Sequence, residues 1–235
     1  MRHIIRALIF DVDETLVYYE GYNLEEWFGR YTAPAIKRLG IEIDAETYRK
    51  MTRGELPRSY VERFGVSHVL FWKTVDGANL KYRIEAAERG KIKPFPDVDA
   101  LKELKDMGLK LAAVSNASQE CTEFVLDLFK LRRYFDAVFG KDYSYLDGAK
   151  PSPYLIEKSL KTLKISPEEA LVVGDSKSDV LAAHRAGVKA VQIVRFEKVE
   201  NADYYVKTLW QLLELVESLN SDQPEPSGIS SKLPL

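Results

Sequence analysis

Apolar residues recur along the chain in short continuous runs, separated by longer stretches in which apolar residues stand at helical spacing. The first run, "IIRALIF" at residues 4–10, is the right length for a buried β-strand. Comparable runs predict further strands at 109–116, 136–140, 169–175, 189–194 and 203–206. Strands that alternate with helices indicate the α/β class, here a parallel sheet with helices on both faces.

Capping residues mark the expected ends of several helices. Asp97 stands where the N-cap of the helix that stops at Gly108 is expected. Ser152 is predicted to cap the next helix, with Pro153 at its first position, where a missing N–H costs nothing. Residues 166–169 have the sequence of a capping box.

Residues 17–92 interrupt the alternation of strands and helices. They show little strand-like patterning, and they contain amphipathic stretches of helical type at about 24–39, 44–52, 56–64 and 67–89. We therefore predict a helical insertion placed directly after the first strand. The predicted division is a core of residues 1–16 and 93–220, an all-helical cap of residues 17–92, and a Pro/Ser-rich tail, 221–235, expected to be disordered.

Composition limits the classes of protein to consider. The chain has 235 residues, 46% of them hydrophobic, which suffices for one or two globular domains. A net charge of −2 gives no overall field that would attract nucleic acid or an anionic membrane, so we expect neither as a partner. No window approaches the roughly 18 apolar residues of a membrane span, and no signal-peptide cleavage site is apparent. Cys121, the single cysteine, is expected to pack in the core of a cytoplasmic protein.

Polar residues gather where the predicted strands end. In open α/β sheets, ligands bind at the carboxyl ends of the strands. The residues predicted at this edge of the sheet are Asp11, Asp13, Ser115, Asn116, Lys150, Gly174, Asp175 and Asp179. The four aspartates would repel one another in one cleft, and a hard divalent cation with oxygen ligands, such as Mg²⁺, would remove that repulsion.

The remaining polar groups suit a phosphate. Lys150 and the N–H groups around Ser115 and Asn116 would complete a site for a dianion. Within such a site, Asp11 is the expected nucleophile, which would form a covalent aspartyl intermediate. Asp13, two residues further on, is the expected acid and base, which would protonate the leaving oxygen and then activate water.

Four motifs in order resemble those of the haloacid dehalogenase superfamily. They are "DVDET" at 11–15, "VSNA" around Ser115, "GAKPSP" around Lys150, and "GDSKSD" from Gly174 to Asp179. The resemblance covers residues 1–16 and 93–215 and implies a Rossmann-like core with a helical cap after the first motif. One departure is Glu14, where many members of the superfamily have glycine.

The resemblance also implies roles for individual residues. Mg²⁺ would be held by the side chains of Asp11 and Asp175, by the backbone carbonyl of Asp13, and by Asp179 directly or through water. The residues expected to bind the phosphate are Thr15, Ser115, Asn116 and Lys150. The expected activity is Mg²⁺-dependent hydrolysis of a small phosphorylated metabolite through an aspartyl phosphate.

Three alternatives to a phosphatase remain open. A metal-independent 2-haloacid dehalogenase looks similar overall but lacks the second aspartate of the first motif, so Asp13 favours the phosphatase. A phosphoglucomutase-like phosphotransferase would use the same site to pass phosphate to a second sugar hydroxyl. A non-catalytic phospho-ligand binder would have no need of Asp13.

The other conspicuous residues have no chemical role in this interpretation. His3, His68 and His184 lie far apart in the sequence and form no ligand set. Neither a P-loop nor a "GxGxxG" is present, so a nucleotide cofactor is unsupported. Tyr18 and Tyr19, the aromatic residues closest in sequence to Asp13, are expected to face the cleft and help select the substrate.

Overall fold

The computed structural model describes residues 4–221 and 230–231 of the chain. Its main sheet has the strand order β5-β4-β1-β6-β7-β8-β9. The strands are β1 (Ala7–Phe10), β4 (Lys110–Ser118), β5 (Ala137–Lys141), β6 (Ala170–Gly174), β7 (Lys189–Ile193), β8 (Tyr204–Val206) and β9 (Ser230–Ser231). Every neighbouring pair is parallel except β8 and β9. The predicted α/β class with a parallel sheet is confirmed.

Strand β1 lies in the middle of the sheet and reads as a continuous apolar run because both of its faces are covered. Phe10, its last residue, pairs with Ala113 of β4 on one side and with Val173 of β6 on the other. The carboxyl ends of these three strands therefore reach the same edge of the sheet. The polar residues that follow them in the sequence are delivered to that edge.

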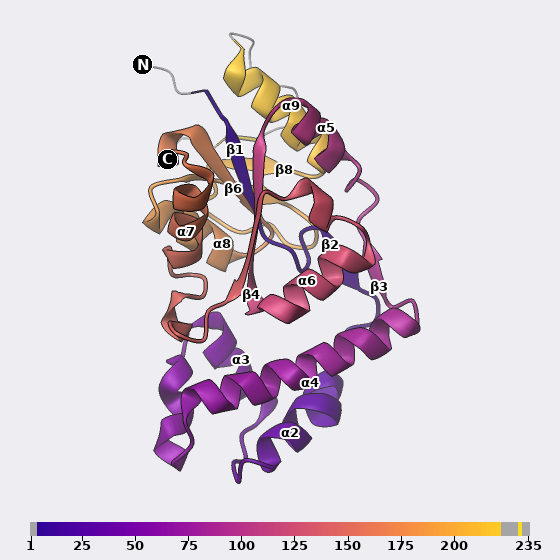
Figure 1. The fold of residues 1–235 in the computed structure, drawn as a ribbon, viewed down its shortest axis with the longest axis vertical. Helices are drawn as coiled ribbons and strands as arrows, with labels where there is room; N and C mark the ends of the chain where they lie inside the picture. The colour runs from indigo at the N-terminus through magenta and orange to yellow at the C-terminus, as the bar shows by residue number, and fades with distance from the viewer. Residues whose placement is uncertain (1–3, 222–229, 232–235) are drawn as a thin grey trace.

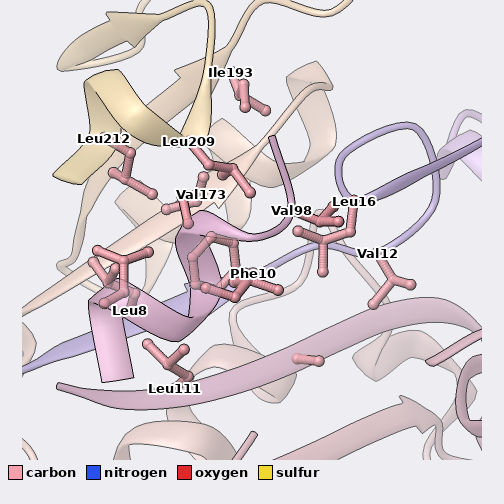
Figure 2. Close-up of a cluster of buried hydrophobic side chains, with 14 of the residues drawn as sticks. Leu8, Phe10, Val12, Leu16, Val98, Leu111, Val173, Ile193, Leu209 and Leu212 are labelled. Atoms are coloured by element: carbon pink, nitrogen blue, oxygen red, sulfur yellow. The ribbon is translucent and has the colours of Figure 1, made fainter. Parts of the chain in front are cut away.

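Alternate residues of β1 face two layers of helices. Leu8 and Phe10 pack against α5 (Ala100–Asp106), α6 (Gln119–Leu128) and α9 (Leu209–Asn220). In Figure 2, Phe10 and Val173 lie in the same buried cluster as Leu209 and Leu212 of α9. Ala7 and Ile9 face the opposite layer, which consists of α7 (Tyr154–Leu163) and α8 (Lys177–Arg185).

A separate helical layer lies below the strand ends in the view of Figure 1. It consists of α1 (Leu24–Trp27), a π-helical turn (Phe28–Thr32), α2 (Ala33–Lys37), α3 (Ala45–Arg53), a 3₁₀ helix (Arg58–Phe64) and α4 (His68–Glu88). It has its own core, in which Met51, Phe71 and Trp72 are fully buried. The helical stretches predicted within residues 17–92 are present.

Two short strands connect this layer to the sheet. β2 (Val17–Tyr19) pairs antiparallel with β3 (Ile92–Pro94), and Val17 lies opposite Pro94. The chain therefore leaves the sheet region and returns to it at one point. These strands were not predicted from the sequence, because three residues are too few to show the alternation typical of a strand.

Two predicted helix starts are wrong. Helix α5 begins after Asp99, because the buried carboxylate of Asp97 binds Arg195 and the backbone N–H of Leu209 instead of capping a helix. Helix α7 begins at Tyr154, with Pro153 in the N-cap position and no side-chain cap.

Two other predictions on local structure have mixed outcomes. The capping box at residues 166–169 is present, but it starts a single 3₁₀ turn, Pro167–Glu169. Most of the predicted tail 221–235 lies outside the described residues, although Ser230 and Ser231 pair with β8. Within the described ranges, no helix is both long and apolar enough to cross a membrane.

Candidate active site

Three of the predicted aspartates meet at the carboxyl edge of the sheet. Asp11 follows β1, Asp175 follows β6, and Asp179 lies in the first turn of α8. One carboxylate oxygen of each lies within 4.8 Å of the others. Among the described residues, the acidic, histidine or cysteine side chains that lie close enough together to share a metal ion are these three aspartates.

Lys150 sits between two of these carboxylates. Its ammonium nitrogen Nζ lies 2.5 Å from Oδ1 of Asp11 and 2.6 Å from Oδ1 of Asp179, and its side chain is only 3% exposed. Burial opposes a charge on Lys150, but the two carboxylates outweigh it and raise the pKa of the ammonium group. Lys150 therefore remains a fixed positive charge in the site.

The charge balance of the cluster is nevertheless unfavourable without a further cation. Burial raises the pKa of Asp11 well above its ordinary value, and Lys150 opposes this shift only in part. Burial, followed by the negative charge of Asp179, raises the pKa of Asp175 to about 6. The carboxylates of Asp11 and Asp175 therefore tend to bind protons, and a divalent cation would replace those protons.

Thr15 and Asn116 support the cluster through hydrogen bonds. The Thr15 hydroxyl lies 3.1 Å from Oδ2 of Asp11 and 3.2 Å from Oδ1 of Asp175. The Asn116 amide donates to the carbonyl oxygen of Lys150 and accepts from its backbone N–H, both at 2.8 Å. Asn116 thus fixes the backbone that carries the lysine.

Ser115 is 2% exposed and lies within β4, three residues before Ser118, the last residue of the strand. Its hydroxyl accepts a hydrogen bond of 3.1 Å from the N–H of Ala117. The residue lies at the predicted edge of the sheet, one strand away from Asp11.

Glycine is required at position 174 for Asp179 to reach the cluster. A Cβ atom at this position would overlap the carboxyl group of Asp179. Asp179 is fixed further by a capping box, in which it accepts a 3.0 Å hydrogen bond from the N–H of Ser176. The "GD" pair of the fourth motif thus reflects close packing as well as chemistry.

Asp13 has a different environment from the other three aspartates. Its carboxylate accepts two hydrogen bonds from Arg83 of α4, at 2.9 and 2.7 Å, and one of 2.7 Å from the Tyr19 hydroxyl. Burial alone would raise the pKa of Asp13, but Arg83 and then Tyr19 outweigh it and lower the pKa. In this arrangement, Asp13 is ionised and is held by the helical layer.

The comparisons with known proteins agree with this geometry. The family model of haloacid dehalogenase-like hydrolases matches residues 5–187, which is most of the chain. The chain belongs to this family. The predicted resemblance and the predicted hydrolase class are confirmed.

Relatives of this hydrolase are phosphatases. It is 33% identical over 229 residues to a protein of Caldanaerobacter subterraneus subsp. tengcongensis provisionally named pyrophosphatase PpaX, covering 94% of this chain and 99% of that one. It is 43% identical over 98 residues to a phosphoglycolate phosphatase of Aquifex aeolicus, covering 41% and 45%.

A solved structure also resembles this hydrolase in fold and sequence. The crystal structure of a HAD phosphatase from Thermococcus onnurineus aligns with a TM-score of 0.59 and 30% identity, covering 88% of this chain and 96% of that one. The hydrolase therefore belongs to the phosphatase branch of the superfamily, and its predicted class of reaction, phosphoester hydrolysis, is confirmed.

Arg83 was missed in the sequence because no motif marks it. It lies 70 residues from Asp13 in sequence, on a long helix with many charged residues. Tyr19 meets the expectation that it faces the cleft, because it lines a cavity of about 450 Å³ together with Asp13 and Arg83. Tyr18 instead packs on the ring of Phe95, with 5.0 Å between ring centroids.

Glu14 adopts a backbone conformation that favours glycine, with φ at 61°. Glycine, which the resemblance of the first motif leads us to expect at this position in many members, would adopt this conformation without strain. Burial, followed by the charges of Asp13 and Asp175, raises the pKa of the Glu14 carboxyl to about 7.

His68, His184 and Cys121 are not part of the acidic cluster. His3 lies outside the described residues. His68 is paired with Glu62, and His184 lies 2.8 Å from Asp203. Cys121 is buried, as expected for a packing residue.

Proposed function

We propose that this hydrolase is a Mg²⁺-dependent phosphomonoesterase that acts on a small phosphorylated metabolite through an aspartyl-phosphate intermediate. The observation that carries the proposal is the cluster of Asp11, Asp175 and Asp179, whose carboxylate oxygens lie within 4.8 Å of one another around the ammonium group of Lys150. A buried nucleophile, a fixed cation and room for a metal ion are the parts that phosphoryl transfer needs.

The donor set fits Mg²⁺. All of the groups are oxygen donors. Burial raises the pKa values of Asp11 and Asp175, and Lys150 opposes these shifts only in part, so a further cation would stabilise the ionised carboxylates. The side chains of Asp11 and Asp175, the backbone carbonyl of Asp13, and Asp179 directly or through water would hold the ion. When bound, Mg²⁺ would neutralise the cluster and the charge on the phosphoryl oxygens.

In the first step, a carboxylate oxygen of Asp11 attacks phosphorus, and the bond between phosphorus and the ester oxygen breaks. Asp13 gives its proton to the leaving oxygen, which departs as an alcohol. Lys150 attracts the phosphoryl oxygens, and Thr15, Ser115 and Asn116 complete the phosphate site.

In the second step, Asp13 takes a proton from a water molecule, which attacks the phosphorus of the aspartyl phosphate. Inorganic phosphate leaves and the Asp11 carboxylate is restored. The pair with Arg83 suits Asp13 as a base because it favours the ionised form. To act as an acid, Asp13 must first accept a proton. Because Arg83 stabilises the ionised form of Asp13, movement of Arg83 away from Asp13 would favour this protonation.

This requirement gives the helical layer a role in catalysis. We assign residues 17–92 as a cap that excludes bulk water when it closes over the strand ends. Arg83 belongs to this layer and Asp13 to the edge of the sheet, so their ion pair links the position of the cap to the protonation of Asp13. A cytoplasmic location is part of the proposal, supported by the single, buried Cys121.

Release of phosphate from p-nitrophenyl phosphate tests the proposal. The wild-type protein with Mg²⁺ is expected to hydrolyse it, EDTA is expected to stop the reaction, and Asp11→Asn is expected to lower kcat by about 10³-fold or more. Asp99→Asn, a change at an exposed aspartate, serves as the matched control. Hydrolysis that survives in the Asp11→Asn variant rules out the nucleophile, and halide release from a 2-haloacid in EDTA identifies a dehalogenase instead.

A further inference from the structure

Five aromatic side chains of residues 17–92 line the cavity of about 450 Å³ that Asp13 also lines. They are Tyr19, Tyr22, Trp27, Tyr48 and Tyr82, here called the aromatic cluster. The centroid of each ring lies within 6.3 Å of the centroid of another ring in the cluster. The five rings are therefore one connected group beside the cavity.

Tyr19 connects the aromatic cluster to the reaction site. Its hydroxyl donates the 2.7 Å hydrogen bond to Asp13, and its ring stacks on that of Tyr82, with 6.0 Å between centroids. In the proposed reaction, Asp13 protonates the leaving oxygen, so the alcohol part of the substrate would occupy the cavity that Asp13 lines. The leaving group is thus the part of the substrate that would contact the aromatic cluster.

Tyr22 differs from the other rings because the fold does not bury it. Trp27 and Tyr48 are 6% and 8% exposed and pack in the core of the helical layer, whereas Tyr22 is 47% exposed. Packing thus accounts for Trp27 and Tyr48. A single exposed aromatic residue would need no explanation, but Tyr22 lies on a cavity next to four other rings, which makes its ring available to a ligand.

The backbone on both sides of Tyr22 is fixed. The N–H of Tyr22 donates to the carbonyl oxygen of Tyr19 at 3.2 Å, which closes a turn. Gly21, inside this turn, has φ at 72°, a conformation that favours glycine. Asn23 follows as the N-cap of α1 and accepts a 3.0 Å hydrogen bond from the N–H of Glu26. A ring on such a fixed turn loses little freedom when it binds a ligand.

The polar residues of the cavity are compatible with an uncharged ring. Two arginines that line it are already paired, Arg83 with Asp13 and Arg49 with Glu46. Asn79 of α4 is half-buried and lines the same cavity. Its amide offers both a donor and an acceptor, which suits the polar edge of a heteroaromatic ring.

We propose that the aromatic cluster, with Tyr22 as its exposed member, binds a planar aromatic ring in the leaving group of the substrate. The preferred substrates are then phosphate monoesters of alcohols that carry such a ring, whether a simple arene or a nucleobase. Aromatic rings attract one another in stacked and edge-to-face arrangements, and bases stack on aromatic side chains in the same way. The proposal rests on the proposed phosphatase function and names the class of its substrate.

The test uses two pairs of substrates. Values of kcat/KM are measured for benzyl phosphate against cyclohexylmethyl phosphate, which differ in the aromaticity of the ring, and for adenosine 5′-monophosphate against ribose 5-phosphate, which differ in the nucleobase. The wild-type enzyme is expected to prefer the aromatic member of at least one pair. Ring contacts and base stacking give a preference of about 2- to 10-fold for benzyl phosphate and about 5- to 100-fold for the nucleotide. The pair that shows the preference identifies the ring as a simple arene or a nucleobase.

Tyr22→Ala is expected to remove most of this preference. It should lower the ratio of kcat/KM within the preferred pair about twofold or more for benzyl phosphate, or about fivefold or more for the nucleotide. Tyr22→Phe, which keeps the ring, should retain the preference. The melting temperature of Tyr22→Ala should stay within about 4 °C of wild type, because the side chain is half exposed.

Phe64→Ala is the matched control. Phe64 belongs to the same helical layer, is 46% exposed, and packs on the ring of Tyr60 with 6.1 Å between centroids. It is not among the residues that line the cavity. This variant should therefore show the same preference as the wild-type enzyme.

Several results would overturn the proposal. A wild-type enzyme without a preference in either pair contradicts it, whether or not any variant folds. So does a Tyr22→Ala variant that keeps the preference, or a Phe64→Ala variant that loses it to the same extent. If the wild-type enzyme hydrolyses none of the four esters, nor p-nitrophenyl phosphate, the proposed function fails instead.

Discussion

At the scale of single residues, the site depends on close packing that leaves no space for a side chain at position 174. Asp179 reaches Lys150 only because residue 174 has no side chain, and Lys150 then lies between Asp11 and Asp179. The sequence predicted that these residues share a site, because each follows a strand or opens the next helix. It did not predict Arg83, which comes from the helical insertion, where no short motif marks a buried cation.

Gly174→Ala tests the close contact. The added methyl group would overlap the carboxyl group of Asp179 and displace it from Lys150. We expect a loss of about 10²-fold or more in kcat/KM, since a displaced catalytic or ligand group costs that much. Gly77→Ala is the control, because nothing lies within 4 Å of a Cβ atom at this position of α4. It should leave kcat/KM unchanged in the same phosphate-release assay. A fully active Gly174→Ala variant contradicts the packing argument.

At the scale of elements, buried ion pairs tie segments that are distant in the sequence. Arg195, after β7, binds the Asp97 carboxylate through two hydrogen bonds of 2.8 Å and the carbonyl oxygen of Thr15 through its Nε and Nη2 atoms. Asp97 also accepts from the N–H of Leu209 at the start of α9. The loop that carries the first motif is therefore held in place by residues from the C-terminal part of the chain, Arg195 and Leu209.

These long-range contacts explain why the start of helix α5 was predicted wrongly from the sequence. The local pattern assigned Asp97 to a helix N-cap, which is the common role of an aspartate before an amphipathic stretch. The pairing with Arg195, 98 residues away, determines its position instead. The strands were easier to predict, because a parallel strand that is buried on both faces consists of a continuous run of apolar residues.

Asp97→Ala is expected to destabilise the fold strongly. It would leave Arg195, whose side chain is 6% exposed, buried without its partner, which costs about 3–5 kcal/mol in the free energy of unfolding. Asp99→Ala, two residues away at an exposed position without a side-chain cap, should stay within about 0.5 kcal/mol of wild type. Urea denaturation of both variants measures the difference, and equal stabilities would refute the role of Asp97.

At the scale of the whole molecule, the sheet supplies carboxylates at its carboxyl edge, and the helical layer supplies a cation to one of them. Asp11, Asp175 and Asp179 come from the sheet side, whereas Arg83, which pairs with Asp13, comes from residues 17–92. The sequence predicted the sheet side of this arrangement from motifs at the strand ends. The side chains contributed by the helical layer depend on how its helices pack, which periodicity does not specify.

The pH dependence of metal binding follows from the acidic cluster. In the metal-free protein, the pKa of Asp175 is raised to about 6, so the folded state holds a proton that the unfolded chain releases near 3.8. This contribution favours the folded state at low pH and is lost as the pH rises through 6, where ionised carboxylates repel one another. Mg²⁺ relieves that repulsion only when the carboxylates are ionised.

Mg²⁺ should therefore raise the melting temperature more at about pH 7.5 than at about pH 5. Differential scanning calorimetry with and without Mg²⁺ at the two pH values measures this. Asp175→Asn is the control, and its melting temperature should respond little to Mg²⁺ at either pH. An equal response of the wild-type protein at both pH values would show that the ion binds elsewhere.

The central claim is that Asp11 carries the phosphoryl group during turnover. Its most direct test is to mix the enzyme with Mg²⁺ and p-nitrophenyl phosphate, quench the reaction in acid during turnover, and analyse the peptide that contains Asp11 by mass spectrometry. The account predicts one added phosphoryl group on Asp11, absent without Mg²⁺ and absent in Asp11→Asn. Continuing turnover with an unmodified Asp11 peptide, or with the phosphoryl group on another residue, would contradict it.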